Sequence, residues 1–223
     1  MQNSAEFIQT LLITGKLASW TTAILFIIGL PIAYFLAFSR CRLKILLEAL
    51  ISMPMVLPPT VLGFYILIAY SPQNWFGRTI EEWFGIRLAF SFSGVLIASI
   101  ICSFPFMIQP LQNGLSALPT SLKEASYTMG KSPINTFFNV LLPNIRGSVI
   151  ISIAMTFAHT VGEFGIVLMV GGNMPGETRV ASIALYDEVQ ALNYEAANQY
   201  AMVLFIASFL VLSVIYSINK KIN

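Results

Sequence analysis

Polar and ionisable side chains recur every three or four residues along one apolar stretch of the sequence: Ser152, Thr156, His159 or Thr160, and Glu163. Residues at this spacing share one face of a helix. The hydroxyl groups alone could satisfy the helix backbone or hold neighbouring helices together, or they could line a passage for a polar solute. His159 and Glu163 favour a passage, because ionisable groups inside an apolar helix are costly and usually functional.

Helix-start and helix-stop signals alternate in the more polar segment 121–143. A capping box, a left-handed glycine, a second N-cap followed by proline, and a terminating proline are typical of two short helices around a sharp turn. A short rigid element of this kind is suited to transmitting a movement from a soluble partner. The residues that carry these signals are Ser121 with Glu124, Gly130, Ser132 with Pro133, and Pro143.

Prolines lie inside two other apolar stretches. Each proline removes a backbone hydrogen bond and can kink its helix. Such kinks are tolerated in a membrane where neighbouring groups satisfy the backbone again. Simple shaping of the helices accounts for them, and a hinge or gate is the functional alternative. The candidates are Pro54, Pro58, Pro59 and Pro105, with Pro110 close by.

The elements that must position these residues are predicted to be membrane-spanning helices. The chain is 57% hydrophobic and only 10% charged, against about a quarter charged in ordinary soluble domains. A spanning helix needs about 20 mostly apolar residues. We therefore expect an all-α integral membrane protein whose single transmembrane domain covers residues 1–223. Its five spans are predicted at about 17–39, 49–70, 92–112, 147–170 and 196–218.

The orientation follows from the basic residues, which collect on the cytoplasmic side of a membrane. With the N-terminus outside, eight of the twelve basic residues fall inside, and most acidic residues fall outside. This distribution predicts an outer N-terminus, an inner C-terminus and a cytoplasmic loop at 119–146. The eight inner residues are Arg40, Arg42, Lys44, Lys123, Lys131, Arg146, Lys220 and Lys221.

Several function classes are not supported by the sequence. The net charge of +2 does not indicate a nucleic-acid partner. Cys41 and Cys102 lie in different surroundings, so we expect no disulfide. With a single histidine and no visible cluster of metal ligands, we expect neither a metal site nor a membrane enzyme. A self-contained secondary carrier would show two related halves and its own coupling-ion site, and neither is visible.

The segment 124–143 resembles the cytoplasmic motif of permease subunits of binding-protein-dependent ABC importers. That motif has Glu-Ala-Ala, three residues, Gly, nine residues and Ile-x-Leu-Pro. Here Ser126 replaces the second alanine and Val140 replaces isoleucine, while the spacing matches throughout. The resemblance implies a type I importer permease fold in which this loop is the coupling helix that docks on an ATPase subunit. The matching residues are Glu124, Ala125, Ser126, Gly130, Val140, Leu142 and Pro143.

A second resemblance points to the substrate class and covers nearly the whole chain from about Leu17. The run His159-Thr160-Val161-Gly162-Glu163-Phe164-Gly165 is similar to the Gly-Glu-Phe-Gly signature of molybdate and sulfate permeases. The segments 53–63, 171–179 and 184–186 look like the molybdate branch. The five-span length also fits molybdate permeases, since sulfate permeases are usually longer. The resemblance therefore implies transport of a tetrahedral oxyanion, with molybdate expected and sulfate or tungstate as alternatives.

The same resemblance bears on the two ionisable residues. The family often has arginine at the position of His159, so a fixed cation there is not implied. A protonated His159 would still contact an anion better than Glu163, whose carboxylate would repel a dianion. We expect Glu163 to be a structural acceptor for backbone or hydroxyl donors, and His159 to face the pathway. The two residues are four apart and could pair with each other.

The resemblance also implies partners. Two copies of the chain would form the pore, two ATPase subunits would dock on the inner loop, and an external binding protein would deliver the oxyanion. The sequence has no Gly-x-x-x-x-Gly-Lys-Ser/Thr loop, so ATP and Mg²⁺ would be bound by the ATPase and this chain would hold no cofactor. We expect it in the inner (plasma) membrane, as a transport subunit that is not itself an enzyme.

Overall fold

Helices make up the fold throughout the part of the chain that the structure, a computed structural model, describes, which is residues 2–39 and 41–222. A hydrocarbon environment offers no water to backbone N–H and C=O groups, and a helix satisfies them within one segment. The all-α prediction is therefore confirmed. Arg40, used above for the orientation, lies outside the described residues, as do the side chains of Lys220 and Lys221.

Three helices are long and apolar enough to cross a membrane alone: α1 (Gln2–Phe38), α5 (Phe92–Ser116) and α12 (Tyr194–Ile222). Helix α1 has 37 residues and is therefore about 55 Å long at 1.5 Å per residue. The hydrocarbon core of a bilayer is only about 30 Å thick. Helix α1 consequently begins well before residue 17, where the first span was predicted to start, and extends beyond the apolar layer.

The other two predicted spans, 49–70 and 147–170, are each divided between two helices. Helices α2 (Lys44–Val56) and α3 (Pro59–Tyr70) are bent by 110°. The span predicted at 147–170 is divided at 163–164 between α9 (Arg146–Gly162) and α10 (Gly165–Gly171), and the segment Pro133–Asn144 before it meets α9 at 78°. Five crossings result if each bent pair counts as one span.

Two consecutive prolines explain the first break. A residue that precedes proline is disfavoured in the helical region, and both Leu57 and Pro58 precede one. Both are extended, with ψ of 137° and 131°. The helix therefore ends at Val56 and starts again with Pro59 in its first turn. Pro54 lies within α2, and Pro105 and Pro110 lie within α5, without dividing these helices.

Short helices connect the long ones. Three of them, with a π-helical turn, form the segment between α5 and α9. The short elements are α4 (Trp75–Phe84), α6 (Thr120–Thr128), α7 (Pro133–Thr136), the π-helical turn η1 (Phe137–Leu141), α8 (Leu142–Asn144), α10 (Gly165–Gly171) and α11 (Ala181–Gln190).

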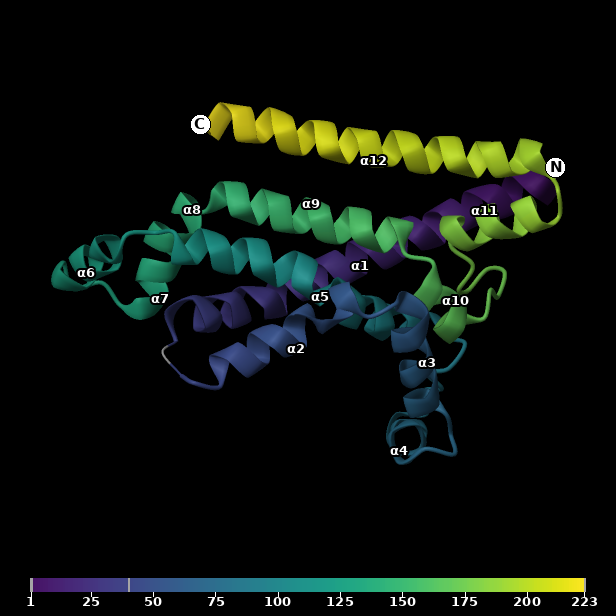
Figure 1. Cartoon of the computed structure of the whole chain (residues 1–223), viewed down its shortest axis with the longest axis horizontal. Coiled ribbons are helices and arrows are strands. Elements are labelled where there is room, and N and C mark those ends of the chain that lie inside the picture. The colour runs from purple at the N-terminus through teal and green to yellow at the C-terminus, as the bar shows by residue number, and fades with distance from the viewer. Residues whose placement is uncertain (1, 40, 223) are drawn as a thin grey trace.

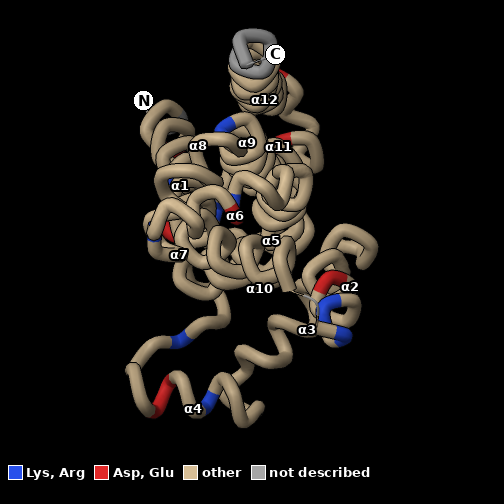
Figure 2. The backbone as a smooth tube through the Cα atoms, turned by 90° about the vertical axis from the view of Figure 1, so that its left-hand side faces the viewer, with Lys and Arg blue, Asp and Glu red and all other residues tan. Residues whose placement is uncertain are grey.

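The long helices α1, α5 and α9 run side by side and form the centre of the bundle, with α12 along one side (Figure 1). Helices α6 to α8 lie at the end where the chain terminates, and α10, α11 and the N-terminus lie at the other (Figure 1). Helices α3 and α4 project away from the bundle, as the end-on view also shows (Figure 2).

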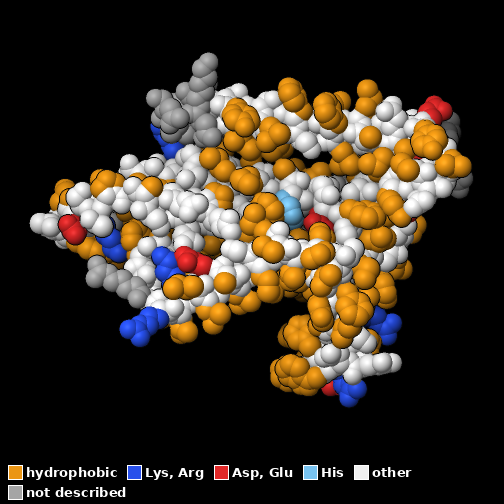
Figure 3. Space-filling model, viewed as in Figure 1, with side chains coloured by type: hydrophobic (Ala, Val, Ile, Leu, Met, Phe, Trp, Pro, Cys, Tyr) orange, Lys and Arg blue, Asp and Glu red, His pale blue; other side chains and the backbone are white. Residues whose placement is uncertain are grey.

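Two large apolar cores hold the bundle together, one toward each end, and a smaller cluster joins Ala181 of α11 to Tyr200 of α12. One contains Leu17 of α1, Cys102 of α5 and Val167 of α10. The other contains Leu25 of α1 and Leu111 of α5. Large apolar side chains also cover the outside, above all on α12 and on α3 and α4 (Figure 3). Such an apolar outer surface suits contact with lipid or with another membrane subunit.

The start of α5 requires a glycine. Ser91 caps the helix by accepting a hydrogen bond from the Gly94 N–H at 3.2 Å, and its own hydroxyl donates to the Leu88 carbonyl at 2.9 Å. A Cβ at position 94 would collide with that same carbonyl oxygen. A side chain cannot be accommodated there unless the capped turn moves.

We predict that Gly94→Ala destabilises the chain by about 1–3 kcal/mol, the usual cost of overpacking. The matched control is Gly15→Ala in α1, because a Cβ there meets nothing within 4 Å and alanine favours a helix by up to about 1 kcal/mol. Thermal unfolding in detergent can be followed by a thiol dye that reacts with the buried Cys102, in a Cys41→Ser background. An unchanged midpoint for Gly94→Ala would contradict the tight packing of this turn.

Candidate functional site

The loop that matches the coupling motif is a rigid elbow, which we define as residues 119–145. Gly130 has φ of +74°, as the sequence predicted. The N–H of Gly130 bonds the Tyr127 carbonyl at 2.9 Å, and the N–H of Lys131 bonds the Ser126 carbonyl at 3.1 Å. This pair of hydrogen bonds is a Schellman motif, which ends α6 and reverses the chain.

The second helix of the elbow starts as predicted. The Ser132 hydroxyl accepts a hydrogen bond from the Asn135 N–H at 3.2 Å, and Pro133 is the first helical residue. The helix then widens into η1 and continues to Asn144, so Pro143 lies one residue from its end. The Asn144 side-chain amide donates to the Val140 carbonyl at 2.7 Å. Pro143 has no N–H to donate, and it lies between a π-helical turn and the bend into α9.

The prediction that Ser121 caps α6 is wrong. The helix begins two residues earlier than predicted, with Pro119 at the N-cap and no side-chain cap, and the Leu122 N–H bonds the Pro119 carbonyl at 3.1 Å. Ser121 is therefore inside the helix and cannot reach the orphan donors at its start. Glu124 is exposed instead of completing a capping box. Among the described residues, no hydrogen bond or ion pair engages its carboxylate, which is available to a partner.

Two contacts that the sequence did not predict fasten the elbow. The Ser126 and Thr136 hydroxyls lie 2.8 Å apart, and both residues are almost fully buried. This hydrogen bond joins α6 to α7 and gives Ser126 a role that alanine could not have. The Lys123 ammonium lies 4.4 Å from the ring centroid of Phe38, a cation–π contact that holds α6 against the end of α1.

The predicted polar face of α9 is turned mainly toward other helices of the same subunit. Ser152, Thr156 and Thr160 are buried. Ser152 donates to the Val149 carbonyl at 2.8 Å, and Thr160 donates to the Thr156 carbonyl at 2.9 Å. These bonds to the helix's own backbone favour the packing interpretation for the two hydroxyls. A pathway role for the three residues stays a prediction.

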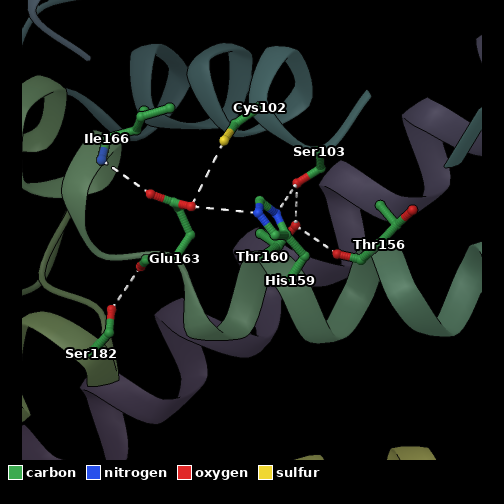
Figure 4. Close-up of polar contacts among 8 residues, drawn as sticks. All are labelled: Cys102, Ser103, Thr156, His159, Thr160, Glu163, Ile166 and Ser182. Atoms are coloured by element: carbon green, nitrogen blue, oxygen red, sulfur yellow. Dashed lines mark hydrogen bonds and ion pairs between the residues drawn. The ribbon is translucent and has the colours of Figure 1, made fainter. Parts of the chain in front are cut away.

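Glu163 lies at the break between α9 and α10 and contacts four elements (Figure 4). Its Oε1 accepts from the Ile166 N–H of α10 at 3.1 Å, and its main-chain carbonyl accepts from the Ser182 hydroxyl of α11 at 2.7 Å. Its Oε2 lies 3.7 Å from the Cys102 Sγ of α5 and 3.7 Å from the His159 Nε2 of α9. Glu163 is thus a structural acceptor, as the sequence predicted.

His159 is held from both sides but remains partly exposed. Its ring stacks on Phe106 with 4.0 Å between the centroids, and its Nδ1 lies 3.1 Å from the Ser103 hydroxyl. The side chain is 23% exposed and is visible as the pale blue histidine in a hollow of the surface (Figure 3). Of the predicted pathway residues, His159 is therefore the one that a solute could reach on this face.

The candidate hinge prolines divide into two groups. Pro58 and Pro59 lie at the break between α2 and α3, and a Cβ at Gly165 would approach the Pro59 ring to 2.9 Å. The break at 57–58 and the break at 163–164 therefore lie against each other. Pro54 and Pro105 lie within continuous helices. This placement makes Pro58 and Pro59 the better candidates for a hinge.

Residues 29–222 match the family described as binding-protein-dependent transport system inner membrane component. The chain is 43% identical over 209 residues to the molybdenum transport system permease protein ModB of Azotobacter vinelandii, covering 93% of this chain and 92% of that protein. It is 34% identical over 209 residues to the probable sulfate transport system permease protein cysT of Zygnema circumcarinatum, covering 94% of this chain and 71% of that protein.

Two solved transporters have the same fold. The inward-facing MetNI methionine ABC transporter matches with a TM-score of 0.75 at 19% identity, over 97% of this chain and 95% of that chain. A bacterial alginate ABC transporter matches with a TM-score of 0.79 at 13% identity, over 97% and 79% of the two chains. The type I importer permease fold expected from the motif is confirmed. The chain belongs to the family of binding-protein-dependent transport system inner membrane components, the permease subunits of ABC importers.

Proposed function

We propose that the chain is the pore subunit of an ATP-driven importer for molybdate, with sulfate or tungstate as the alternative substrate. The elbow is the observation that supports an ATP-driven transporter. It presents the exposed Glu124 at one end of the bundle, and it is fastened to α1 and α9. The choice of molybdate is supported by the near full-length similarity to a molybdenum permease. The similarity to a sulfate permease supports the alternative.

The proposed complex has two copies of this chain, two ATPase subunits that bind ATP and Mg²⁺, and an external binding protein. The elbow end would face the cytoplasm, in agreement with the excess of basic residues predicted there. The opposite end carries a cleft of about 540 Å³ between the starts of α1 and α12, lined by Glu6, Glu188 and Glu195. This acidic cleft would attract a basic surface of the binding protein.

The elbow would transmit the work of the ATPase to the pore through α9. Its second half joins α9 at a fixed bend of 78°, and Leu141 within it is buried in the apolar core at that end. A displacement of the elbow would therefore move α9 as a lever. At the far end of that lever are His159 and the break at Glu163. We place His159 at the pathway, with Glu163 holding its surroundings in shape and not contacting the dianion.

The direct test is uptake of radiolabelled molybdate into vesicles that contain this chain, its ATPase and its binding protein. We expect uptake to require all three proteins and ATP, and to be inhibited by unlabelled tungstate more strongly than by sulfate. Stronger inhibition by sulfate would favour sulfate as the substrate in place of molybdate. Uptake by the chain alone without ATP would overturn the importer proposal in favour of a secondary carrier.

Substitutions in the elbow test the coupling. We predict that Glu124→Gln reduces the amount of ATPase that co-purifies with the chain roughly tenfold, equivalent to about 1.4 kcal/mol, because a charged contact is lost. The matched control is Glu177→Gln, an exposed carboxylate in the loop before α11, which should leave co-purification unchanged. Equal effects of the two substitutions, or none for Glu124, would argue strongly against docking at the elbow.

Gly130→Ala tests the shape of the same element. Alanine at φ of +74° costs roughly 1–2 kcal/mol, and a Cβ there meets no other atom within 4 Å. We therefore expect the chain to fold and insert, but the Schellman turn to open and uptake to fall by at least about tenfold at normal expression. Uptake at the wild-type rate would show that this turn is not needed for coupling.

A further inference from the structure

Three side chains that metals commonly bind meet at the break between α9 and α10. Cys102, His159 and Glu163 each offer one ligand atom, and these atoms all lie within 4.8 Å of one another. The Sγ–Oε2 and Nε2–Oε2 separations are both 3.7 Å. This cluster could not be recognised from the sequence, which predicted no metal site, because Cys102 is 57 or more residues from the other two.

The surrounding hydrogen bonds are compatible with the tautomer of His159 that carries its proton on Nδ1. The Thr160 hydroxyl donates to the Thr156 carbonyl at 2.9 Å, so its oxygen is free to accept from the Ser103 hydroxyl, 3.0 Å away. The Ser103 oxygen then accepts from the N–H at His159 Nδ1, at 3.1 Å. This tautomer leaves the lone pair on Nε2, directed toward Glu163 (Figure 4). It is the arrangement that outer hydrogen bonds impose on metal-binding histidines.

The lone pair of Nε2 and the carboxylate of Glu163 face each other across 3.7 Å. Two acceptors at this separation repel unless a cation lies between them, and the cation can be a proton or a metal ion. Glu163 is 93% buried by side-chain accessibility, since only 7% is exposed. An ionised carboxylate inside a membrane protein is costly without such a partner.

We propose that Cys102, His159 and Glu163 bind a single divalent ion of the zinc type. With Zn–S of about 2.3 Å and Zn–N and Zn–O of about 2.0 Å, tetrahedral angles place nitrogen and oxygen about 3.3 Å apart, and sulfur about 3.5 Å from each. The two measured separations of 3.7 Å, and that between Sγ and Nε2, which is within 4.8 Å, would therefore shorten when the ion binds. On binding, the Cys102 thiol releases its proton to solvent and the thiolate sulfur forms the bond to the ion. Thiolate and carboxylate then balance the double positive charge, so the site with its ion bound carries no net charge.

The donor set decides the class of ion. Thiolate and imidazole are poor ligands for Mg²⁺ and Ca²⁺, which prefer oxygen, whereas Zn²⁺ and Co²⁺ accept sulfur, nitrogen and oxygen together. Three protein ligands leave a fourth position for water, and the partly exposed His159 gives access from the hollow on this face (Figure 3). The bound ion would tie α5 to α9 beside the break. This site does not depend on which oxyanion the chain transports.

Titration of the purified full-length chain with Co²⁺ tests the proposal, in a Cys41→Ser background that removes the other cysteine. We expect a thiolate-to-cobalt charge-transfer band and the visible bands of a tetrahedral site, at one ion per chain. Excess Zn²⁺ should displace the cobalt and raise the thermal unfolding midpoint, whereas Mg²⁺ should do neither. An absent charge-transfer band, or one that survives Cys102→Ser, would overturn the proposal.

Four variants separate metal binding from a merely structural cluster. Cys102→Ser and His159→Gln each remove a ligand and should weaken Zn²⁺ binding by more than about 100-fold, beyond the usual effect of an outer partner. Ser103→Ala removes only the bond to Nδ1 and should weaken binding by about 10–100-fold. Glu163→Gln keeps an acceptor for the Ile166 N–H, so the variant should fold and fail to bind the ion. Equal zinc affinity in all four variants and the parent would refute the site.

Discussion

The absence of water in a lipid bilayer constrains this fold more than any other factor, because every interruption of a helix must find its hydrogen-bond partners within the protein. Glu163 shows how one interruption is resolved. Its carboxylate accepts from the Ile166 N–H, which starts α10, and its main-chain carbonyl accepts from Ser182 of α11. One residue thereby closes the gap between two helices and fastens a third. The same carboxylate lies between Cys102 and His159. The residue that joins α9 to α10 therefore also belongs to the cluster of ionisable side chains.

The interruptions are arranged so that movement could pass from one end of the bundle to the other. The elbow joins α9 at a bend of 78°, and α9 runs for 17 residues to Gly162, or about 25 Å. At its far end, the break at 163–164 packs against the break between α2 and α3, where Gly165 approaches Pro59. A rigid lever between two irregular junctions is the kind of arrangement in which a hinge motion can be localised.

Features governed by neighbouring residues could be predicted from the sequence. Gly130 and Ser132 behave as expected, because a left-handed turn and an N-cap depend on the residues immediately around them. Ser121 did not, since the helix starts at Thr120 after Pro119 and local signals fix a helix end only to within a residue or two. The Ser126–Thr136 bond and the approach of Cys102 to His159 could not be predicted, because they depend on how separate helices pack. The apolar pattern located the spans but gave no sign of the 110° bend.

The central claim is that the elbow is where a separate ATPase engages this membrane bundle. A photo-crosslinking amino acid at Met129, which is 76% exposed on the elbow, tests it directly in the assembled complex. Trp75, which is 78% exposed on α4, is the matched control because it lies away from the elbow, near the other end. The account predicts a crosslink to the ATPase from position 129 and none from position 75. Capture of the ATPase from position 75, or none from position 129, would contradict it.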